Sequence, residues 1–364
     1  MNKSISKFLS KFSYSDINPG NAPYKYLINN YKCDVKKFGN KKPMNVSITG
    51  ATGNIGYAIA FRIAHGDMLG QDQPVNLKLV DIPEAENKMI GMKYELEDCS
   101  FPALNEITTH TSLSSGFKDA DVAMLIGIKQ TVSGGERADG LLNNAEIMRN
   151  NGKAINENAD RDVKVLIVGN PVNTNCLIAM KAAPNLKPQN FHSMSRLDHN
   201  RTVHKLADIF KVHYSLIEKV FIWGNHDATM YPELEYGYVN SQKITEVLDR
   251  DFIRNEFVDI ISTRWKEIIQ YRCLTSCASA ANSAIDHVRD WHLGTKEWVS
   301  KGIYSDGSLY GVPKDIMFSF PVTVNSASKV MPVKDLVLND YTKEKIRITT
   351  ESLLEERRIV EKYL

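Results

Sequence analysis

Apolar residues follow two different rhythms along the first half of this chain. Between residues 44 and 170, short and nearly continuous apolar runs alternate with longer segments in which apolar residues recur every three or four positions. The runs are typical of strands buried on both faces, and the recurring pattern is typical of amphipathic helices. The alternation therefore predicts an α/β fold, a doubly wound parallel sheet with helices on both faces. We expect strands around 46–48, at 76–81, near 107, at 121–127 and at 163–169, with helices over 55–64, 88–99 and 139–159.

The pattern of apolar and polar residues changes at about residue 197. A helical pattern over 199–211 precedes a strand over 219–224, and the proline-free segment that follows predicts long helix over 246–289, in two pieces. Strands near 302 and over 318–324 and a charged helix over 341–363 complete a mixed α+β domain. The chain is thus expected to comprise an N-terminal arm (1–43), a doubly wound domain (44–196) and a second domain (197–364).

Three glycines follow the first strand at a regular spacing. They are Gly50, Gly53 and Gly56, and a helical pattern begins among them. Gly50 would allow a tight turn, Gly53 a close approach of backbone to a pyrophosphate, and Gly56 close packing of helix on strand. We therefore place these glycines, together with Asn54 and Ile55, in a dinucleotide site, although a Gly-rich surface turn has the same spacing.

The second expected strand ends in a carboxylate at Asp81. An acid at this position can accept hydrogen bonds from both ribose hydroxyls of an adenosine, and it would repel a 2′-phosphate. An aspartate that caps a loop would look the same in isolation. The order of strand, glycines, helix, strand and acid favours a cofactor site, with NAD rather than NADP as the cofactor.

Composition and charge exclude several classes of protein. The net charge of +2 gives no overall electrostatic footprint for nucleic acid, and no apolar run approaches the length of about 20 residues that a membrane helix needs. The five cysteines lack the paired spacing of a zinc site or of a disulfide framework. We therefore predict no metal, no nucleic acid partner, no membrane span and a reducing, cytoplasmic compartment.

Positive charge is concentrated at the N-terminus, where residues 1–43 contain nine lysines and two acids. Over residues 1–15, apolar side chains fall on one helical face with lysines beside them, and this pattern fits three interpretations. It suits a mitochondrial presequence, a basic arm that docks on a larger assembly such as the cytoskeleton, or an inert tail. All three stay open, and the first would place the protein in the mitochondrial matrix.

Four motifs of the chain resemble those of the malate dehydrogenase family, most closely its cytosolic-type branch within the lactate/malate dehydrogenase superfamily. They are GNPVNTNC at 169–176, RLDHNR at 196–201, WGNH at 223–226 and SDGSLYGVP at 305–313. The resemblance extends from about Met44 to the C-terminus. It implies a Rossmann domain that binds NAD, a substrate domain after it, oxidoreductase activity with malate and oxaloacetate as the first expected substrates, and a homodimer.

The resemblance also assigns roles to single residues. His226 would exchange a proton with the substrate hydroxyl, a task that suits an imidazole, and Asp198 would orient it. Arg201, three residues after Asp198, would bind the C1 carboxylate with its guanidinium fork. Further matches place Asn170 and the pair Thr275 and Ser276 at the substrate, and Gly127, Asn144 and Val168 near the cofactor.

The mobile lid of the family is the segment in which this sequence departs from the pattern. The family has Pro-Arg-Arg early in the lid, where this chain has Gln-Thr-Val at 130–132. The first of those arginines pairs with the distal carboxylate of malate, so Thr131 stands in its place and Lys129 is the neighbouring cation. The late arginine of the lid is kept as Arg137, which would polarise the substrate carbonyl.

This departure leaves the substrate open. Loss of one partner of a buried charge pair costs about 2–5 kcal/mol, which is about 30- to 3,000-fold against a dicarboxylate. Three outcomes fit the sequence. The chain is a malate dehydrogenase in which Lys129 and Thr131 meet the distal end of the substrate, an oxidoreductase for a different 2-oxo acid, or a degraded enzyme that serves as a structural subunit docked through residues 1–43.

Overall fold

The computed structural model describes residues 41–129 and 137–364 of the chain. The predicted N-terminal arm lies outside these ranges except for its last three residues, and so does most of the predicted lid. Within the described ranges, no helix combines the length and the apolar character that crossing a membrane requires.

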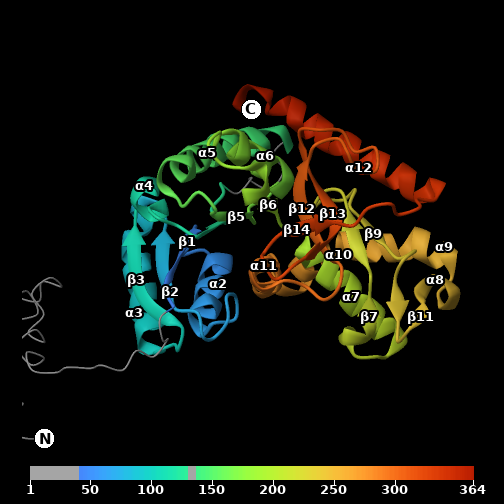
Figure 1. The fold of residues 1–364 in the computed structure, drawn as a ribbon, viewed down its shortest axis with the longest axis horizontal. Helices are drawn as coiled ribbons and strands as arrows, with labels where there is room; N and C mark the ends of the chain where they lie inside the picture. Colours follow the sequence, from blue (N-terminus) through green and yellow to red (C-terminus); the bar gives the residue numbers. More distant parts are fainter. Residues whose placement is uncertain (1–40, 130–136) are drawn as a thin grey trace, which may run out of the picture. The chain divides into compact units, whose positions relative to one another are not determined.

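In the described part of the chain, nine strands form one continuous sheet (Figure 1). Their order is β14-β13-β12-β6-β5-β4-β1-β2-β3, and the six strands from β6 to β3 pair in parallel. The chain enters this sheet at β1 and winds outward in both directions, which confirms the predicted doubly wound α/β fold. The parallel strands are β1 (Met44–Thr49), β2 (Val75–Val80), β3 (Leu104–His110), β4 (Val122–Leu125), β5 (Lys164–Ile167) and β6 (Phe191–Ser193).

Helices cover both faces of the parallel strands, and strand side chains alternate between the two layers. On β4, Val122 and Met124 pack into one core, whereas Ala123 and Leu125 pack into the other. Because both faces are buried, these strands read as continuous apolar runs in the sequence. The first layer contains α2 (Asn54–His65), α3 (Glu86–Asp98) and α11 (Ala278–Leu293), and the second contains α4 (Leu113–Phe117), α5 (Arg137–Asn158) and α6 (Val172–Lys181).

Three antiparallel strands from the second half of the chain extend the same sheet beyond β6. They are β12 (Val299–Ser305), β13 (Ile316–Val324) and β14 (Val330–Pro332). The predicted boundary after residue 196 falls at the start of α7 (Arg196–Phe210), and strands from both sides of this boundary belong to the same sheet. Two small sheets pair β8 (Phe221–Trp223) with β9 (Tyr231–Glu233), and β10 (Tyr238–Val239) with both β7 (Ile217–Glu218) and β11 (Gln242–Lys243).

The long helix expected over 246–289 forms in two main pieces, as predicted. Its main pieces are α10 (Val258–Arg272) and α11, and they are separated at Cys273, where a φ of 55° ends the first helix. α10 continues without a break from α9 (Arg250–Phe252) and a π-helical turn (Ile253–Phe257), whereas α8 (Ile244–Val247) is separate. The strand expected over 219–224 is shorter than predicted, because β8 covers 221–223, and Lys219, with a φ of 55°, separates it from β7. The charged helix at the C-terminus is α12 (Asp340–Ile359).

A cluster of buried basic side chains lies between β6, β12 and α11. The Lys301 side chain is 0% exposed, and its Nζ donates a hydrogen bond to the main-chain oxygen of His287 at 2.6 Å. Burial lowers the pKa of this amine to about 7, while the carboxylate of Asp290 opposes the shift and the guanidinium of Arg196 adds to it. Burial also lowers the pKa of His192 and His287 well below the ordinary value. Keeping these groups buried therefore costs more free energy as the pH falls.

Replacing Lys301 with methionine is expected to flatten the pH dependence of stability above pH 7. The folded amine has the lower pKa, so unfolded chains bind more protons between about pH 7 and pH 10, and the free energy of unfolding rises with pH over this range. One full proton corresponds to about 1.4 kcal/mol per pH unit. Urea unfolding at pH 7, 8 and 9 measures the slope, with Lys296→Met, at an exposed lysine, as the control. Equal slopes in all three proteins would contradict the prediction.

Candidate active site

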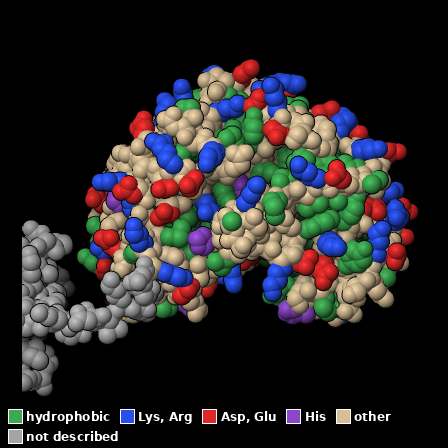
Figure 2. All heavy atoms as spheres, viewed as in Figure 1, with side chains coloured by type: hydrophobic (Ala, Val, Ile, Leu, Met, Phe, Trp, Pro, Cys, Tyr) green, Lys and Arg blue, Asp and Glu red, His purple; other side chains and the backbone are tan. Residues whose placement is uncertain are grey.

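A cleft of about 1210 Å³ is lined by residues at the carboxyl ends of the parallel strands. Its walls come from the turn after β1, the ends of β2, β4 and β5, the start of α7, the segment after β8, and α10. Ligands of open α/β sheets bind at this edge, where the strand order reverses. On the face drawn in Figure 2, acidic and basic side chains are interspersed, without an extended patch of one sign.

The turn between β1 and α2 brings backbone very close to backbone. Gly50 has a φ of 64°, and a Cβ built on it would lie 2.7 Å from the Cα of Gly127. A Cβ on Gly56 would clash with the main-chain oxygen of Gly50. Gly53 caps the N-terminus of α2 and lines the cleft, so no side chain of its own covers the N–H groups of the first turn. This glycine cradle (Gly50, Gly53, Gly56 and Gly127) fits the pyrophosphate of a dinucleotide.

Asp81 follows β2 and lines the same cleft. One of its carboxylate oxygens accepts hydrogen bonds from the main-chain N–H and the hydroxyl of Thr52, at 3.0 and 2.8 Å. The other oxygen accepts from the main-chain N–H of Ile82 at 2.9 Å. These bonds fix the carboxylate at the cleft wall and leave acceptor capacity for a ribose hydroxyl. Thr52 was not predicted, because its contact with Asp81 joins two separate turns of the fold.

Seven of the nine residues predicted to lie near the cofactor line the cleft, namely Gly50, Gly53, Asn54, Ile55, Asp81, Gly127 and Val168. Among the described lining residues Gly56 and Asn144 do not appear, Gly56 because it packs beneath the turn. The buried side chain of Asn144 accepts from the main-chain N–H of Lys129 at 2.8 Å and donates to the carbonyl oxygen of the same residue at 3.0 Å. This clamp fixes the residue that precedes the lid, and a cofactor contact of Asn144 stays a prediction.

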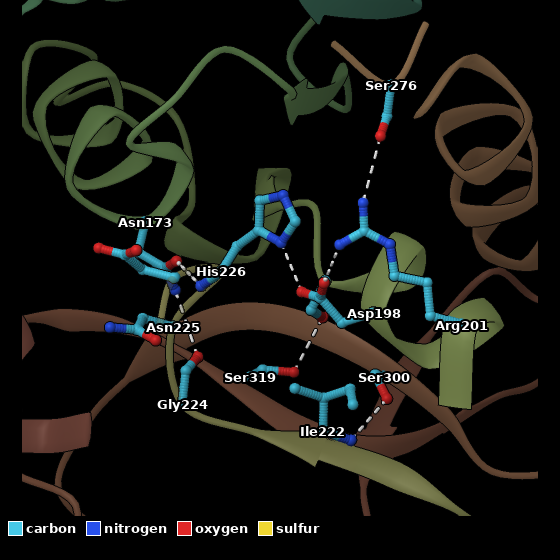
Figure 3. A network of polar contacts seen from close by, with 12 residues as sticks. Asn173, Asp198, Arg201, Ile222, Gly224, Asn225, His226, Ser276, Ser300 and Ser319 are labelled. Atoms are coloured by element: carbon cyan, nitrogen blue, oxygen red, sulfur yellow. Dashed lines mark hydrogen bonds and ion pairs between the residues drawn. The ribbon is translucent and has the colours of Figure 1, made fainter. Parts of the chain in front are cut away.

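The imidazole of His226 is joined to a buried carboxylate. Its Nδ1 contacts Oδ2 of Asp198 on α7, and the Asp198 side chain is only 2% exposed (Figure 3). Because a carboxylate oxygen accepts, we assign the proton of this contact to Nδ1, which leaves Nε2 as the nitrogen for a ligand in the cleft. The structure thus brings together two residues that are 28 positions apart, as the resemblance implied.

Arg201 lies one helical turn after Asp198 and contacts the other oxygen of the same carboxylate. Its Nη1 donates to Oδ1 of Asp198 at 3.3 Å, and its Nη2 donates to the hydroxyl of Ser276, also at 3.3 Å (Figure 3). Arg201, Thr275 and Ser276 all line the cleft. A guanidinium carries five N–H donors, so Arg201 retains donors for a carboxylate that enters the cleft.

The turn that carries His226 is held by residues that the sequence did not single out for this role. The main-chain N–H of His226 donates to Oδ1 of Asn173 at 3.1 Å, and the amide of Asn173 donates to the carbonyl oxygen of Met317 at 2.9 Å. Two residues before the histidine, Gly224 has a φ of 93°, and a Cβ there would clash with Oγ1 of Thr349. These contacts join segments far apart in the chain, so no local pattern marks them.

The remaining substrate residues of the prediction are placed only in part. Asn170, after β5, and Lys129, after β4, line the cleft. Arg137 is the first residue of α5, but its side chain lies outside the described part of the structure, as does the whole of Thr131. The roles of these four residues in substrate binding stay predictions.

Known proteins match this chain over nearly all of its described residues. The model for the lactate/malate dehydrogenase NAD binding domain matches residues 44–192, and that for the alpha/beta C-terminal domain of the same family matches 195–363. Malate dehydrogenase from Naegleria fowleri is 41% identical, with a TM-score of 0.87, over 89% of this chain and 99% of that one. Lactate dehydrogenase from Trichomonas vaginalis, solved with NADH and oxamate, is 38% identical, with a TM-score of 0.85, over 88% of this chain and 98% of that one.

Malate dehydrogenase from Plasmodium falciparum, 19% identical with a TM-score of 0.75 over 88% of this chain and 99% of that one, shares the fold. The glycine cradle and Asp81 suit NAD, and the matched NAD binding domain begins at the first residue of β1. The matched C-terminal domain contains Asp198, Arg201 and His226. This chain therefore belongs to the lactate/malate dehydrogenase family of NAD-binding oxidoreductases.

Proposed function

We propose that this protein transfers a hydride between NAD and a small 2-hydroxy acid, which it interconverts with the corresponding 2-oxo acid. The observation that carries the proposal is the arrangement of Asp198, Arg201 and His226 in the cleft that also contains the glycine cradle. A proton acceptor, a carboxylate that braces it and a guanidinium are the groups that oxidation of a hydroxy acid requires.

Each of these residues has a separate role in the proposed reaction. Bound NAD would accept the hydride that leaves C2 of the hydroxy acid. Nε2 of His226 takes the proton of the C2 hydroxyl, and Asp198 stabilises the imidazolium that results. Arg201 binds the C1 carboxylate through parallel N–H bonds and so positions C2. When the 2-oxo acid is reduced, His226 returns the proton to the carbonyl oxygen, and the role of Arg137 would be to polarise that carbonyl.

Two substrate pairs fit this class. Malate and oxaloacetate are favoured by Lys129, a cation that lines the cleft and would meet a distal carboxylate. Lactate and pyruvate are favoured by the neutral Thr131 where the family has an arginine. The likeness to a malate dehydrogenase at 41% identity and to a lactate dehydrogenase at 38% supports both pairs about equally.

Steady-state oxidation of NADH by the full chain, with oxaloacetate, pyruvate and glyoxylate as substrates, tests the proposal. We expect turnover with at least one of these 2-oxo acids. If the enzyme prefers oxaloacetate through Lys129, then Lys129→Met raises KM for oxaloacetate by about 10-fold or more and leaves KM for pyruvate unchanged. No turnover with any 2-oxo acid, in protein that binds NADH, would reject the proposal and favour a structural subunit.

The assembly of the protein is a separate expectation. The homodimer implied by the resemblance, and docking of residues 1–43 on a larger partner, both stay predictions. Sedimentation of the full chain in the presence and absence of NADH would measure the first.

A further inference from the structure

One face of α10 supplies an apolar wall to the cleft. Ser262, Trp265 and Ile269 line the cleft, and their spacing of three and four residues places them in one stripe along the helix. The same helix is anchored by Val258 and Ile261, which are 7% and 2% exposed. The stripe is therefore a fixed part of the fold, and we refer to Trp265 and Ile269 as the α10 wall.

Both side chains of the α10 wall are large, apolar and open to solvent. Trp265 is 46% exposed and Ile269 is 38% exposed, although both lie in a concave site. Apolar surface that is exposed to water is unfavourable, so a ligand that covers it in a cleft gains binding free energy. An indole also offers a flat surface of large area that ordinary core packing would bury.

Few cationic side chains share the described cleft lining with the α10 wall. Among the described lining residues, the lysines and arginines are Lys129 and Arg201 alone. Arg201 is held between Asp198 and Ser276, in the place where a C1 carboxylate would bind. α10 packs against α7, the helix that carries Arg201 and Asp198, and both helices supply lining residues to the same cleft.

We propose that the α10 wall receives the group attached to C3 of the 2-oxo acid, and that the enzyme selects substrates in which this group is uncharged and apolar. The inference rests on the proposed function and narrows its substrate class. A 2-oxo acid with its carboxylate on Arg201 and its carbonyl oxygen at His226 has only its C3 substituent left to enter the part of the cleft that the dinucleotide does not occupy. An apolar substituent would cover Trp265, whereas a carboxylate there would lose its hydration against an apolar surface.

A series of 2-oxo acids with growing side chains tests this inference. The series is glyoxylate, pyruvate, 2-oxobutyrate and 4-methyl-2-oxopentanoate, with oxaloacetate as the charged member. We expect kcat/KM of the wild-type protein to rise along the uncharged series and to be lower for oxaloacetate than for 2-oxobutyrate. One methylene in an apolar pocket changes selectivity by about 10- to 200-fold at most, so the steps should lie at or below this range.

Trp265→Ala should remove the preference without removing the chemistry. We expect kcat/KM for 4-methyl-2-oxopentanoate to fall by about 10- to 200-fold, mainly through KM, while glyoxylate, which has no C3, changes by less than about 3-fold. Trp265→Phe keeps an aromatic surface and should restore most of the loss. Tyr271→Ala is the matched control, because Tyr271 lies on the same helix, is 82% exposed and is absent from the described cleft lining.

Each alternative result has a definite meaning. An equal loss for glyoxylate and for the longer acids in Trp265→Ala would assign Trp265 a structural role and overturn the inference. A higher kcat/KM of the wild-type protein for oxaloacetate than for 2-oxobutyrate would overturn it too. If no 2-oxo acid is turned over, the proposed function fails, and calorimetric titration of 4-methyl-2-oxopentanoate into the NADH-bound protein decides the inference separately. Binding that Trp265→Ala weakens would support it, and binding that is absent or unchanged would not.

Discussion

Replacing His226 with asparagine is expected to lower kcat by about 10²- to 10⁴-fold while the affinity for NADH stays unchanged. Asparagine can still donate a hydrogen bond to Asp198, so the turn and the buried carboxylate keep a partner, but an amide cannot take and return a proton. The glycine cradle and Asp81 lie on other elements of the cleft, so binding of the dinucleotide should not depend on this side chain. Steady-state kinetics gives kcat, and a fluorescence titration of NADH gives Kd.

Asp198→Asn provides a companion measurement for the same unit. The asparagine would keep the shape of the site but would no longer hold Nδ1 of His226 as a donor or stabilise the imidazolium. Because the two residues act together, the double variant should be no slower than His226→Asn alone, within about 3-fold. A double variant that is slower by the product of the two single losses would show that Asp198 acts independently of His226.

The site residues that could be predicted from the sequence are those that belong to a recognisable pattern of neighbouring residues. Gly50, Gly53 and Gly56 are visible in the sequence because of their regular spacing after a strand, and the structure gives the clashes that exclude a Cβ at Gly50 and Gly56. Asp81 was found because it ends a strand whose place in the sheet follows from the strand order. Asp198 and His226 were paired through the family resemblance, since nothing in their spacing of 28 residues predicts contact.

The residues that were missed act across long stretches of chain. Asn173 holds the main chain of His226 from 53 positions away, and Thr52 holds Asp81 from 29 positions away. Their polar side chains look like ordinary caps in the sequence. Trp265 was missed for a different reason, because an aromatic residue at helical spacing predicts a core position, and only the structure shows that this side of α10 faces a cleft.

The extent of the sheet also could not be predicted from local sequence patterns. A change of pattern near residue 197 predicts where the second domain begins, but it does not show that the pairing of Gly302 on β12 with Ser193 on β6 carries the sheet into the second half of the chain. A Cβ on Gly302 would clash with Oγ of Ser193, so this glycine permits the close contact of the two strands. Such a pairing joins residues more than 100 positions apart, and a sequence pattern gives the strands without their neighbours.

Replacing Arg201 with lysine is expected to lower kcat/KM for every 2-oxo acid by about 30- to 3,000-fold, glyoxylate included. Lysine keeps the positive charge but presents a single ammonium in place of the planar fork that binds both oxygens of a carboxylate. The loss should be similar along the series of 2-oxo acids, because the C1 carboxylate is common to all of them. Steady-state kinetics with the substrates used for Trp265 measures it.

Arg201 is also part of the structure, so its replacement needs a stability control. Its guanidinium contacts the buried Asp198 and the hydroxyl of Ser276, and Arg201→Ala would leave that carboxylate with the His226 contact as its remaining ion pair among those described. We expect Arg201→Ala to lower the free energy of unfolding by about 1–3 kcal/mol, and guanidinium ion added to the assay to restore part of its activity. A selective loss for the longer 2-oxo acids, with glyoxylate spared, would show that Arg201 binds the distal group instead of the C1 carboxylate. Neither the C1 role of Arg201 nor the C3 role of the α10 wall would survive that result.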